Sequence, residues 1–282
     1  MRIVLATMND IGKYSLEELV KFVEVVGLFT VQERGRLYMD PSDFSGLART
    51  HGIPLYKTAD INAEEVAGRM RAMRPDLGMC LGWKQIIRKE VLGIPRYGWI
   101  GGHPAKLLLK GERPDPDTFS ARGNEPIQYA IRGGYKKTGM SLVWLKARID
   151  EGEVFARGDV AIDEHETSAT LVQKIGRLTG QLIRENMQSI VDGRPPRLPQ
   201  ERDNPQPYTK PLLADDNRID LHAPIEETYR LIRSEYYPYP NAFLDFHGQR
   251  IYIEHARMEH GEFTELKVRA GGSPYASPAS SI

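Results

Sequence analysis

The chain has 282 residues, enough for one large domain or for a medium domain with a smaller one. Lys and Arg together number 38, as do Asp and Glu, so the formal net charge is zero. This balance argues against a protein whose main task is to grip nucleic acid, because neutralising phosphates requires a surplus of positive charge.

The cysteine content and the apolar runs exclude further classes. A single cysteine, Cys80, rules out an internal disulfide and favours a reducing compartment. It lies in the apolar run LGMCLGW and is expected to be a core residue. The first ten residues are typical of a short strand rather than of a signal peptide, and no stretch approaches the roughly 20 apolar residues that cross a membrane. We therefore expect a cytoplasmic protein without a membrane partner.

Short apolar runs alternate with helical patterns through the first hundred residues. Strands are expected at 2–7, 23–31, 53–58, 76–83 and 97–102, and helices at 15–22, 44–52, 62–73 and 84–93. Ser15 and Asn62 have the residue types of helix N-caps, and Glu18 would complete a capping box with Ser15. Strands and helices at this spacing favour parallel pairing through right-handed crossovers. The sequence therefore predicts an α/β fold, Rossmann-like with a mostly parallel sheet, in which ligands bind beyond the carboxyl ends of the strands.

The second half is less regular. A proline-rich loop is expected at 111–126, a helix at 125–134, two antiparallel strands within 138–162, and an amphipathic helix at 168–193. A polar, proline-rich segment follows at 194–211, then a helix at 223–236, a hairpin at 243–256 and a frayed C-terminus. These features divide the chain into a large domain, 1–195, a linker, 196–210, and a small C-terminal α+β subdomain, 211–282, made of a helix and a hairpin.

A histidine between glycines and a proline stands just after the fifth expected strand. In WIGGHPAKLLL, His103 follows Gly101 and Gly102 and precedes Pro104. Glycines let a ligand approach the backbone closely because they have no Cβ, and a histidine side chain with a pKa near neutrality suits proton transfer. His103 is therefore a candidate functional residue. The other histidines show no paired spacing of the kind that holds a metal ion.

Several short motifs follow one another in a characteristic order. They are His103-Pro104, Arg122-Gly123, Pro126-Ile127 before a helix, Thr138-Gly139 and Asp150-Glu151-Gly152. In this order the chain resembles the formyltransferases that use 10-formyltetrahydrofolate, over a match from Leu77 to Leu171 and a weaker one at 216–243. The resemblance implies a Rossmann-like formyltransferase fold and transfer of a formyl group to a primary amine.

The resemblance also implies a catalytic trio of Asn, His and Asp. It assigns the His to His103 and the Asp to Asp150, whereas the Asn, two residues before the His, is replaced by Gly101. In this chemistry an amine attacks the formyl carbon, a negative oxygen develops, and a His–Asp pair suits the proton transfers. Losing one donor to such an oxygen typically slows a reaction by roughly 10²–10³-fold. An active enzyme would therefore need another donor, for which Asn124, a backbone N–H and a water molecule are alternatives.

Two ligand-binding walls follow from the same resemblance. The folate donor would contact the stretch 81–92, mainly through backbone groups, at Leu81, Trp83, Gln85, Ile86 and Ile87, with Lys146, Arg148 and Ile149 as the opposite wall. The acceptor is expected near Asn9, Arg122 and Gln128, with a helix N-cap as an equally good role for Asn9. No metal site is expected. The absence of a P-loop or G-x-G-x-x-G sequence disfavours a nucleoside triphosphate or nicotinamide site.

Within the resembling family, the sequence favours a small acceptor, most simply a nucleotide-linked amino sugar, as in the sugar-nucleotide N-formyltransferases. A methionyl-tRNA acceptor would require a basic face and a longer C-terminal barrel than the residues after the linker provide. The hairpin at 243–256 is expected to form a homodimer. Two other functions remain open: hydrolysis of 10-formyltetrahydrofolate with water as acceptor, and a catalytically silent folate-binding protein.

Overall fold

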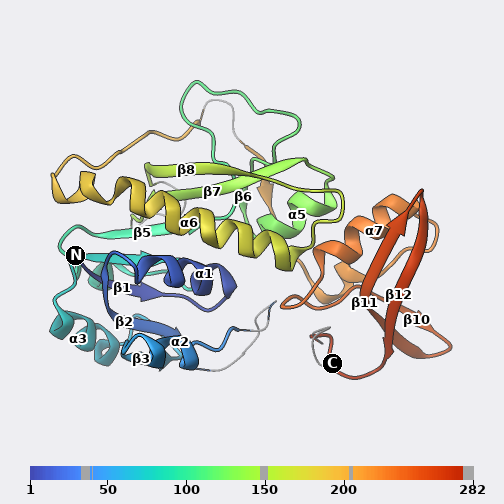
Figure 1. The fold of residues 1–282 in the computed structure, drawn as a ribbon, viewed down its shortest axis with the longest axis horizontal. Helices are drawn as coiled ribbons and strands as arrows, with labels where there is room; N and C mark the ends of the chain where they lie inside the picture. Colours follow the sequence, from blue (N-terminus) through green and yellow to red (C-terminus); the bar gives the residue numbers. More distant parts are fainter. Residues whose placement is uncertain (33–38, 40, 147–151, 203–205, 276–282) are drawn as a thin grey trace.

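The computed structural model describes residues 1–32, 39, 41–146, 152–202 and 206–275 (Figure 1). The larger part of the molecule contains β1 (Arg2–Ala6), α1 (Asp10–Leu19), β2 (Glu24–Val31), α2 (Ser45–Thr50), β3 (Leu55–Thr58), α3 (Glu64–Met73), β4 (Leu77–Cys80), α4 (Lys89–Leu92), β5 (Trp99–His103), β6 (Arg122–Gly123), α5 (Pro126–Arg132), β7 (Lys137–Trp144), β8 (Val154–Ala161) and α6 (Ser168–Val191). These are followed by β9 (Tyr208–Thr209), the 3₁₀ turn η1 (Ala214–Asn217), α7 (Ile225–Ser234), β10 (Phe243–Phe246), β11 (Gln249–Glu259) and β12 (Glu262–Ala270).

A central sheet organises the larger part, with strands in the order β3-β2-β1-β4-β5-β7-β8. Neighbouring strands from β3 to β5 are parallel, whereas β7 is antiparallel to both β5 and β8. Side chains alternate between the two faces of β1. Ile3 and Leu5 join the core that includes α1 and α6, and Val4 and Ala6 join the core that includes α3. The predicted Rossmann-like fold with a mostly parallel sheet is confirmed (Figure 1).

The first helix begins earlier than its capping pattern predicts. Ser15 and Glu18 predict a start at residue 15, but α1 starts at Asp10 and Ser15 lies inside it. The Ser15 hydroxyl donates to the carbonyl of Ile11 at 2.6 Å, and the Ser15 side chain is fully buried. The predicted N-cap was wrong because Ile11, one turn earlier, already belongs to the helix and packs into the core.

The stretch after β4 is a loop rather than the helix predicted over 84–93, of which only α4 is helical. Asn62 holds this loop. Its Oδ1 accepts from the N–H of Arg88 at 2.7 Å, and its Nδ2 donates to the carbonyl of Ile86 at 2.9 Å. Asn62 is therefore not the N-cap of α3, which begins after Ala63. The consequence for the site is a non-helical segment fixed at the carboxyl end of β4.

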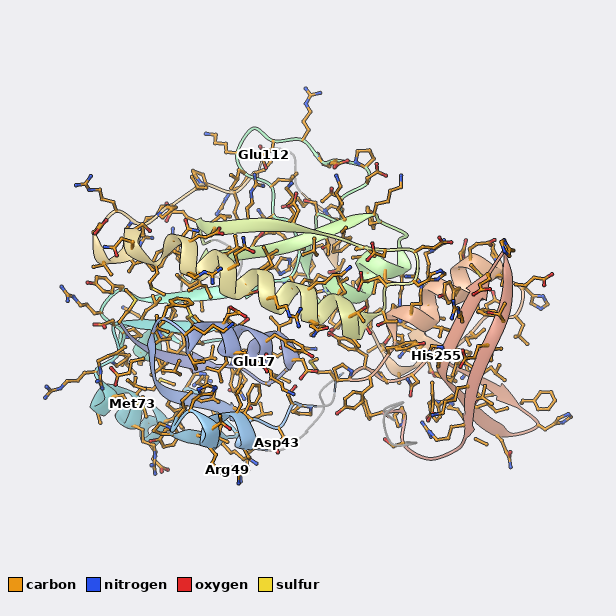
Figure 2. The ribbon with its side chains drawn as sticks, in the orientation of Figure 1. Glu17, Asp43, Arg49, Met73, Glu112 and His255 are labelled. Atoms are coloured by element: carbon orange, nitrogen blue, oxygen red, sulfur yellow. The ribbon has the colours of Figure 1, made fainter. Side chains whose placement is uncertain are left out.

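The described residues that follow α6 contact the larger domain at several points. β9 pairs with β6, and Leu198 forms a bridge with Val154. The loop 104–121 lies beside it and carries Glu112, which Figure 2 shows at the top of the molecule. The Glu112 carboxylate accepts from Nη1 of Arg157, on β8, at 2.6 Å. The N–H of Lys110 donates to the carbonyl of Pro199, and the N–H of Glu201 donates to the carbonyl of Leu108, so residues expected to form a linker also hold this loop.

The C-terminal unit has one strand more than the predicted hairpin. β10, β11 and β12 form an antiparallel sheet, on which α7 packs through a core of its own. This unit lies at one end of the larger domain, with α7 beside α5 (Figure 1). Nη2 of Arg132 on α5 donates to Oε1 of the fully buried Glu235 at 2.6 Å. Across the described ranges, no helix is both long and apolar enough to cross a lipid bilayer.

Candidate active site

Two cavities meet at the carboxyl end of β5. The Glu125 cavity has a volume of about 310 Å³ and the Lys146 cavity about 230 Å³, each named here after one lining residue. Four residues line both of them: Trp83, Lys84, Gly102 and His103. Because β4 and β5 are parallel neighbours, their carboxyl ends bring the loop after β4 beside His103. Ligand sites of open α/β sheets occupy this position.

His103 is the last residue of β5 and stands where the cavities join. Its Nε2 lies 2.8 Å from the carbonyl oxygen of Ala121. A carbonyl only accepts, so Nε2 carries the hydrogen and Nδ1 is the accepting nitrogen of the neutral ring. The Ala121 contact therefore sets both the ring orientation and the tautomer.

Gly101 lies two residues before His103, so a side chain at position 101 would project from the same face of β5. A Cβ on Gly101 would come within 2.5 Å of Cδ2 of Leu145. Both residues line the Lys146 cavity. The glycine thus allows Leu145 to pack directly against the strand.

The Lys146 cavity gathers most residues predicted to contact the folate donor: Trp83, Gln85, Ile86, Ile87 and Lys146. Leu81 is fully buried in the core and is not part of its wall. The Gln85 side chain accepts a hydrogen bond from the N–H of Ile61 at 3.0 Å, which fixes the loop after β4 to the segment before α3. Arg148 and Ile149 lie outside the described residues.

Besides His103 and Trp83, the Glu125 cavity contains three predicted residues, Asn9, Asn124 and Gln128. Asn9 precedes α1, but its side chain makes no capping hydrogen bond, which leaves the amide as part of the cavity wall. Arg122 is absent from this wall, because its Nη2 donates to the carbonyl of Glu201 at 3.0 Å. Asp150, the predicted carboxylate partner of His103, lies outside the described residues.

Three lining residues were not identified from the sequence: Lys84, Glu125 and Tyr239. Nζ of Lys84 lies 2.6 Å from Oε1 of Glu125. Tyr239 comes from the C-terminal unit, and burial, with a smaller contribution from the Glu125 carboxylate, raises the pKa of its hydroxyl. Lys84 lies inside the stretch 81–92, and Glu125 directly precedes the Pro126-Ile127 motif, so their proximity to motif residues was an available signal. Nothing local indicates Tyr239.

The remaining titratable groups near the site are not arranged for other chemistry. Burial raises the pKa of the Cys80 thiol to about 12, so the thiol stays protonated at neutral pH. Cys80 is not a fully buried core residue as expected: it is partly exposed, packs against the core that includes α3 and lines the Lys146 cavity. Among the residues that the structure describes, no three His, Cys, Asp or Glu side chains are grouped to hold a metal ion.

A Rossmann-like sheet with two cavities joined at a histidine could hold two ligands side by side for group transfer. Comparison with known proteins identifies the class of enzyme. The family model described as formyl transferase matches residues 15–187, and that of the formyl transferase C-terminal domain matches residues 212–275. The chain therefore belongs to the formyl transferase family.

Individual relatives differ in the acceptor named for them. Methionyl-tRNA formyltransferase of Bacillus velezensis is 30% identical over 285 residues, which cover 98% of this chain and 86% of the relative. Among solved structures, methionyl-tRNA formyltransferase from Clostridium thermocellum superposes with a TM-score of 0.64 at 19% identity, covering 96% of this chain and 98% of that one. A sugar N-formyltransferase from Shewanella gives 0.64 at 16% identity, covering 90% and 97%. The structural likenesses show a shared fold.

Membership of this family makes the protein an N-formyltransferase with 10-formyltetrahydrofolate as formyl donor. The Lys146 cavity fits a folate ring on two grounds. Trp83, Ile87 and Leu145 supply apolar wall, and the N–H groups of residues 83–87 donate no hydrogen bond within the part of the chain that is described. Such free backbone groups can pair with the polar edge of a heterocycle.

Proposed function

We propose that this protein transfers the formyl group of 10-formyltetrahydrofolate to the primary amine of a small polar acceptor, a nucleotide-linked amino sugar. One observation carries the proposal: two cavities of different character share a wall that contains His103. The donor would occupy the Lys146 cavity and the acceptor amine the Glu125 cavity, so the reacting atoms would meet beside the imidazole. Holding two reactants in register removes much of the entropic barrier.

His103 would handle the proton of the acceptor amine. When bound, the donor supplies an electrophilic formyl carbon attached to a folate nitrogen. With the hydrogen on Nε2, Nδ1 of His103 can accept the proton that the amine loses as it bonds to the formyl carbon. The same nitrogen can return that proton to the folate nitrogen as the formyl–nitrogen bond breaks and tetrahydrofolate leaves. Asp150 is proposed to stabilise the resulting imidazolium through its negative charge, and Asn124 to donate to the developing oxygen charge. Asn124 lines the same cavity as His103.

The composition of the Glu125 cavity supports a polar acceptor. Its wall carries an ion pair, three side-chain amides and a histidine, beside apolar side chains such as Ile11, Met39 and Ile127. Methionyl-tRNA remains the second candidate, because several relatives about 30% identical over most of the chain carry that name. The predicted homodimer and cytoplasmic location stay predictions.

A test supplies 10-formyltetrahydrofolate with a panel of nucleotide-linked amino sugars, with methionyl-tRNA, and with no acceptor. We expect formylation of one amino sugar and release of tetrahydrofolate in equal amounts. Formylation of methionyl-tRNA alone would replace the proposed acceptor, and formate release without an amine would indicate hydrolysis.

The site residues are tested in the same assay. His103→Ala and Asp150→Asn should lower kcat by at least about 10²-fold while leaving the melting temperature within a few degrees. Activity within a few-fold of wild type in both variants would refute the site. Gly46→Ala is a suitable control, because a Cβ there meets nothing within 4 Å.

A further inference from the structure

Glu125 has a backbone conformation that its residue type rarely adopts. It precedes α5 with φ of 47° and ψ of 44°, the left-handed region that favours glycine. The next residue, Pro126, restricts it further. Non-glycine residues keep such conformations only where the surroundings fix them, and these positions cluster at ligand sites. The strained backbone at Glu125 therefore indicates a functional role for its side chain.

The Glu125 carboxylate is buried and held at one oxygen. Its side chain is 7% exposed, and Oε1 lies 2.6 Å from Nζ of Lys84, which is 38% exposed. The second oxygen, Oε2, has no hydrogen-bond partner within the described ranges. Lys84 comes from the loop after β4, so this ion pair links the two segments that frame His103.

The position of the Glu125 carboxylate determines which of the two ligands it can contact. Glu125 lines the cavity proposed for the acceptor and not the Lys146 cavity, whereas Lys84 and His103 line both. An ionised carboxylate only accepts hydrogen bonds. A group on the acceptor that pairs with Oε2 must therefore be a donor, and a thioether or a hydrocarbon cannot take its place.

We propose that Glu125 is a specificity-determining residue, whose carboxylate accepts a hydrogen bond from a hydroxyl next to the acceptor amine. This inference rests on the proposed function and extends it, because it names the group by which an amino sugar is recognised. Lys84 is the positioning residue that holds the carboxylate in place.

The physical basis is the cost of leaving a buried charge without a partner. A site built to pair with a substrate hydroxyl rejects an analogue that lacks it by roughly 10⁴-fold in the best cases, because its own polar group is then left desolvated. A cavity with a fixed carboxylate in its wall can therefore discriminate more strongly than an apolar pocket of the same size.

The experiment compares wild type, Glu125→Gln, Glu125→Gly and Arg74→Gly. Acceptors are the amino sugar with the highest turnover and its deoxy analogue without the hydroxyl next to the amine. Glu125→Gly removes the carboxylate and relieves the left-handed strain, so it stays informative if Glu125→Gln folds poorly. Arg74, with φ of 46° at the end of α3, is the matched control for strain relief.

We expect Glu125→Gly to raise KM for the amino sugar by about 10- to 100-fold, the value of a hydrogen bond to a charged group. Glu125→Gln loses the charge but keeps an acceptor oxygen, so it should raise KM by a smaller factor. KM for the deoxy analogue should change little, so the variants should lose the preference of wild type for the amino sugar over its deoxy analogue. Tetrahydrofolate binding should be unchanged, and Arg74→Gly should match wild type throughout.

Two failures are distinguishable. If both folded Glu125 variants keep the wild-type KM and preference, the role of Glu125 is refuted while the proposed function stands. If wild type transfers no formyl group to any amino sugar, the proposed function is wrong. Calorimetric titration of the amino-sugar panel into tetrahydrofolate-loaded protein then decides the inference: binding that Glu125→Gly abolishes supports it, and no binding, or equal binding, overturns it.

Discussion

Gly101 offers a direct test of how the strand shapes the donor site. The perturbation is Gly101→Ala, which adds a single methyl group to β5. The ideal Cβ would lie 2.5 Å from Cδ2 and 3.2 Å from Cγ of Leu145, far inside van der Waals contact. Gly101 pairs with Cys80 on one side and Val143 on the other, so the strand itself has little freedom to move. Leu145 must therefore shift.

The magnitude follows from the cost of overpacking. Adding a methyl to a well-packed position typically costs about 1–3 kcal/mol. Leu145 is half-buried and lines the Lys146 cavity, so part of the strain is relieved by rotation of its side chain into that space. The free energy of unfolding should fall by about 1 kcal/mol. The displaced side chain should also raise KM for the folate donor by about tenfold, a loss of 1.4 kcal/mol in binding.

The assay combines urea denaturation with donor titration of Gly101→Ala, Leu145→Ala and the double variant. Truncating Leu145 removes the clash, so the double variant should lose less stability than the two single variants summed, with a coupling of about 1 kcal/mol or more. Additive losses, or an unchanged donor KM in Gly101→Ala, would refute the reasoning.

Three further predictions concern contacts around the site. Glu235→Ala leaves Arg132 without its buried partner and should cost about 3–5 kcal/mol in urea denaturation, whereas a loss below 1 kcal/mol would show that α5 and α7 are held by other contacts. The hydrogen bond from Arg157 lowers the pKa of Glu112, so its contribution to stability is present above pH 4.5 and is lost on acidification through the lowered pKa. Glu112→Gln should therefore show a flatter decline of melting temperature below pH 4.5, and parallel curves would contradict this. Tyr239→Phe keeps the ring but removes the hydroxyl, and should raise KM for the acceptor while KM for the donor stays the same. A change in the donor KM alone would contradict the assignment of the Glu125 cavity to the acceptor.

The fold was predictable because most of its strands have a local sequence signal. Runs such as RIVLAT and the spacing of helical segments between them predict a parallel sheet without tertiary information. β12 was missed because the residues of EFTELKVRA are largely exposed on both faces, so no apolar alternation marks the strand. The start of α1 was misplaced because Ser15 has a capping residue type, while tertiary packing of Ile11 extends the helix.

Residues of the candidate site were predictable only where they lie in or beside a recognisable sequence motif. His103 stands out because glycines and a proline surround it, and the loop after β4 because it follows an apolar strand. Glu125 and Lys84 are 41 residues apart, and ordinary charged residues in loops give no sign of pairing. The left-handed backbone at Glu125 is also invisible in sequence, since glycine is the residue type that signals it.

The two parts of the chain contribute unequally to the two cavities, and this bears on how acceptor choice is set. Every residue of the Lys146 cavity lies between Cys80 and Gly152, within the segment that matches the formyl transferase model. The Glu125 cavity also takes Tyr239 from the segment that matches the C-terminal domain. A change in the C-terminal unit can therefore reshape the cavity proposed for the acceptor while the cavity proposed for the donor stays intact. Because Arg132 and Glu235 fix α5 to this unit, the helix that begins directly after Glu125 would transmit such a change to the carboxylate.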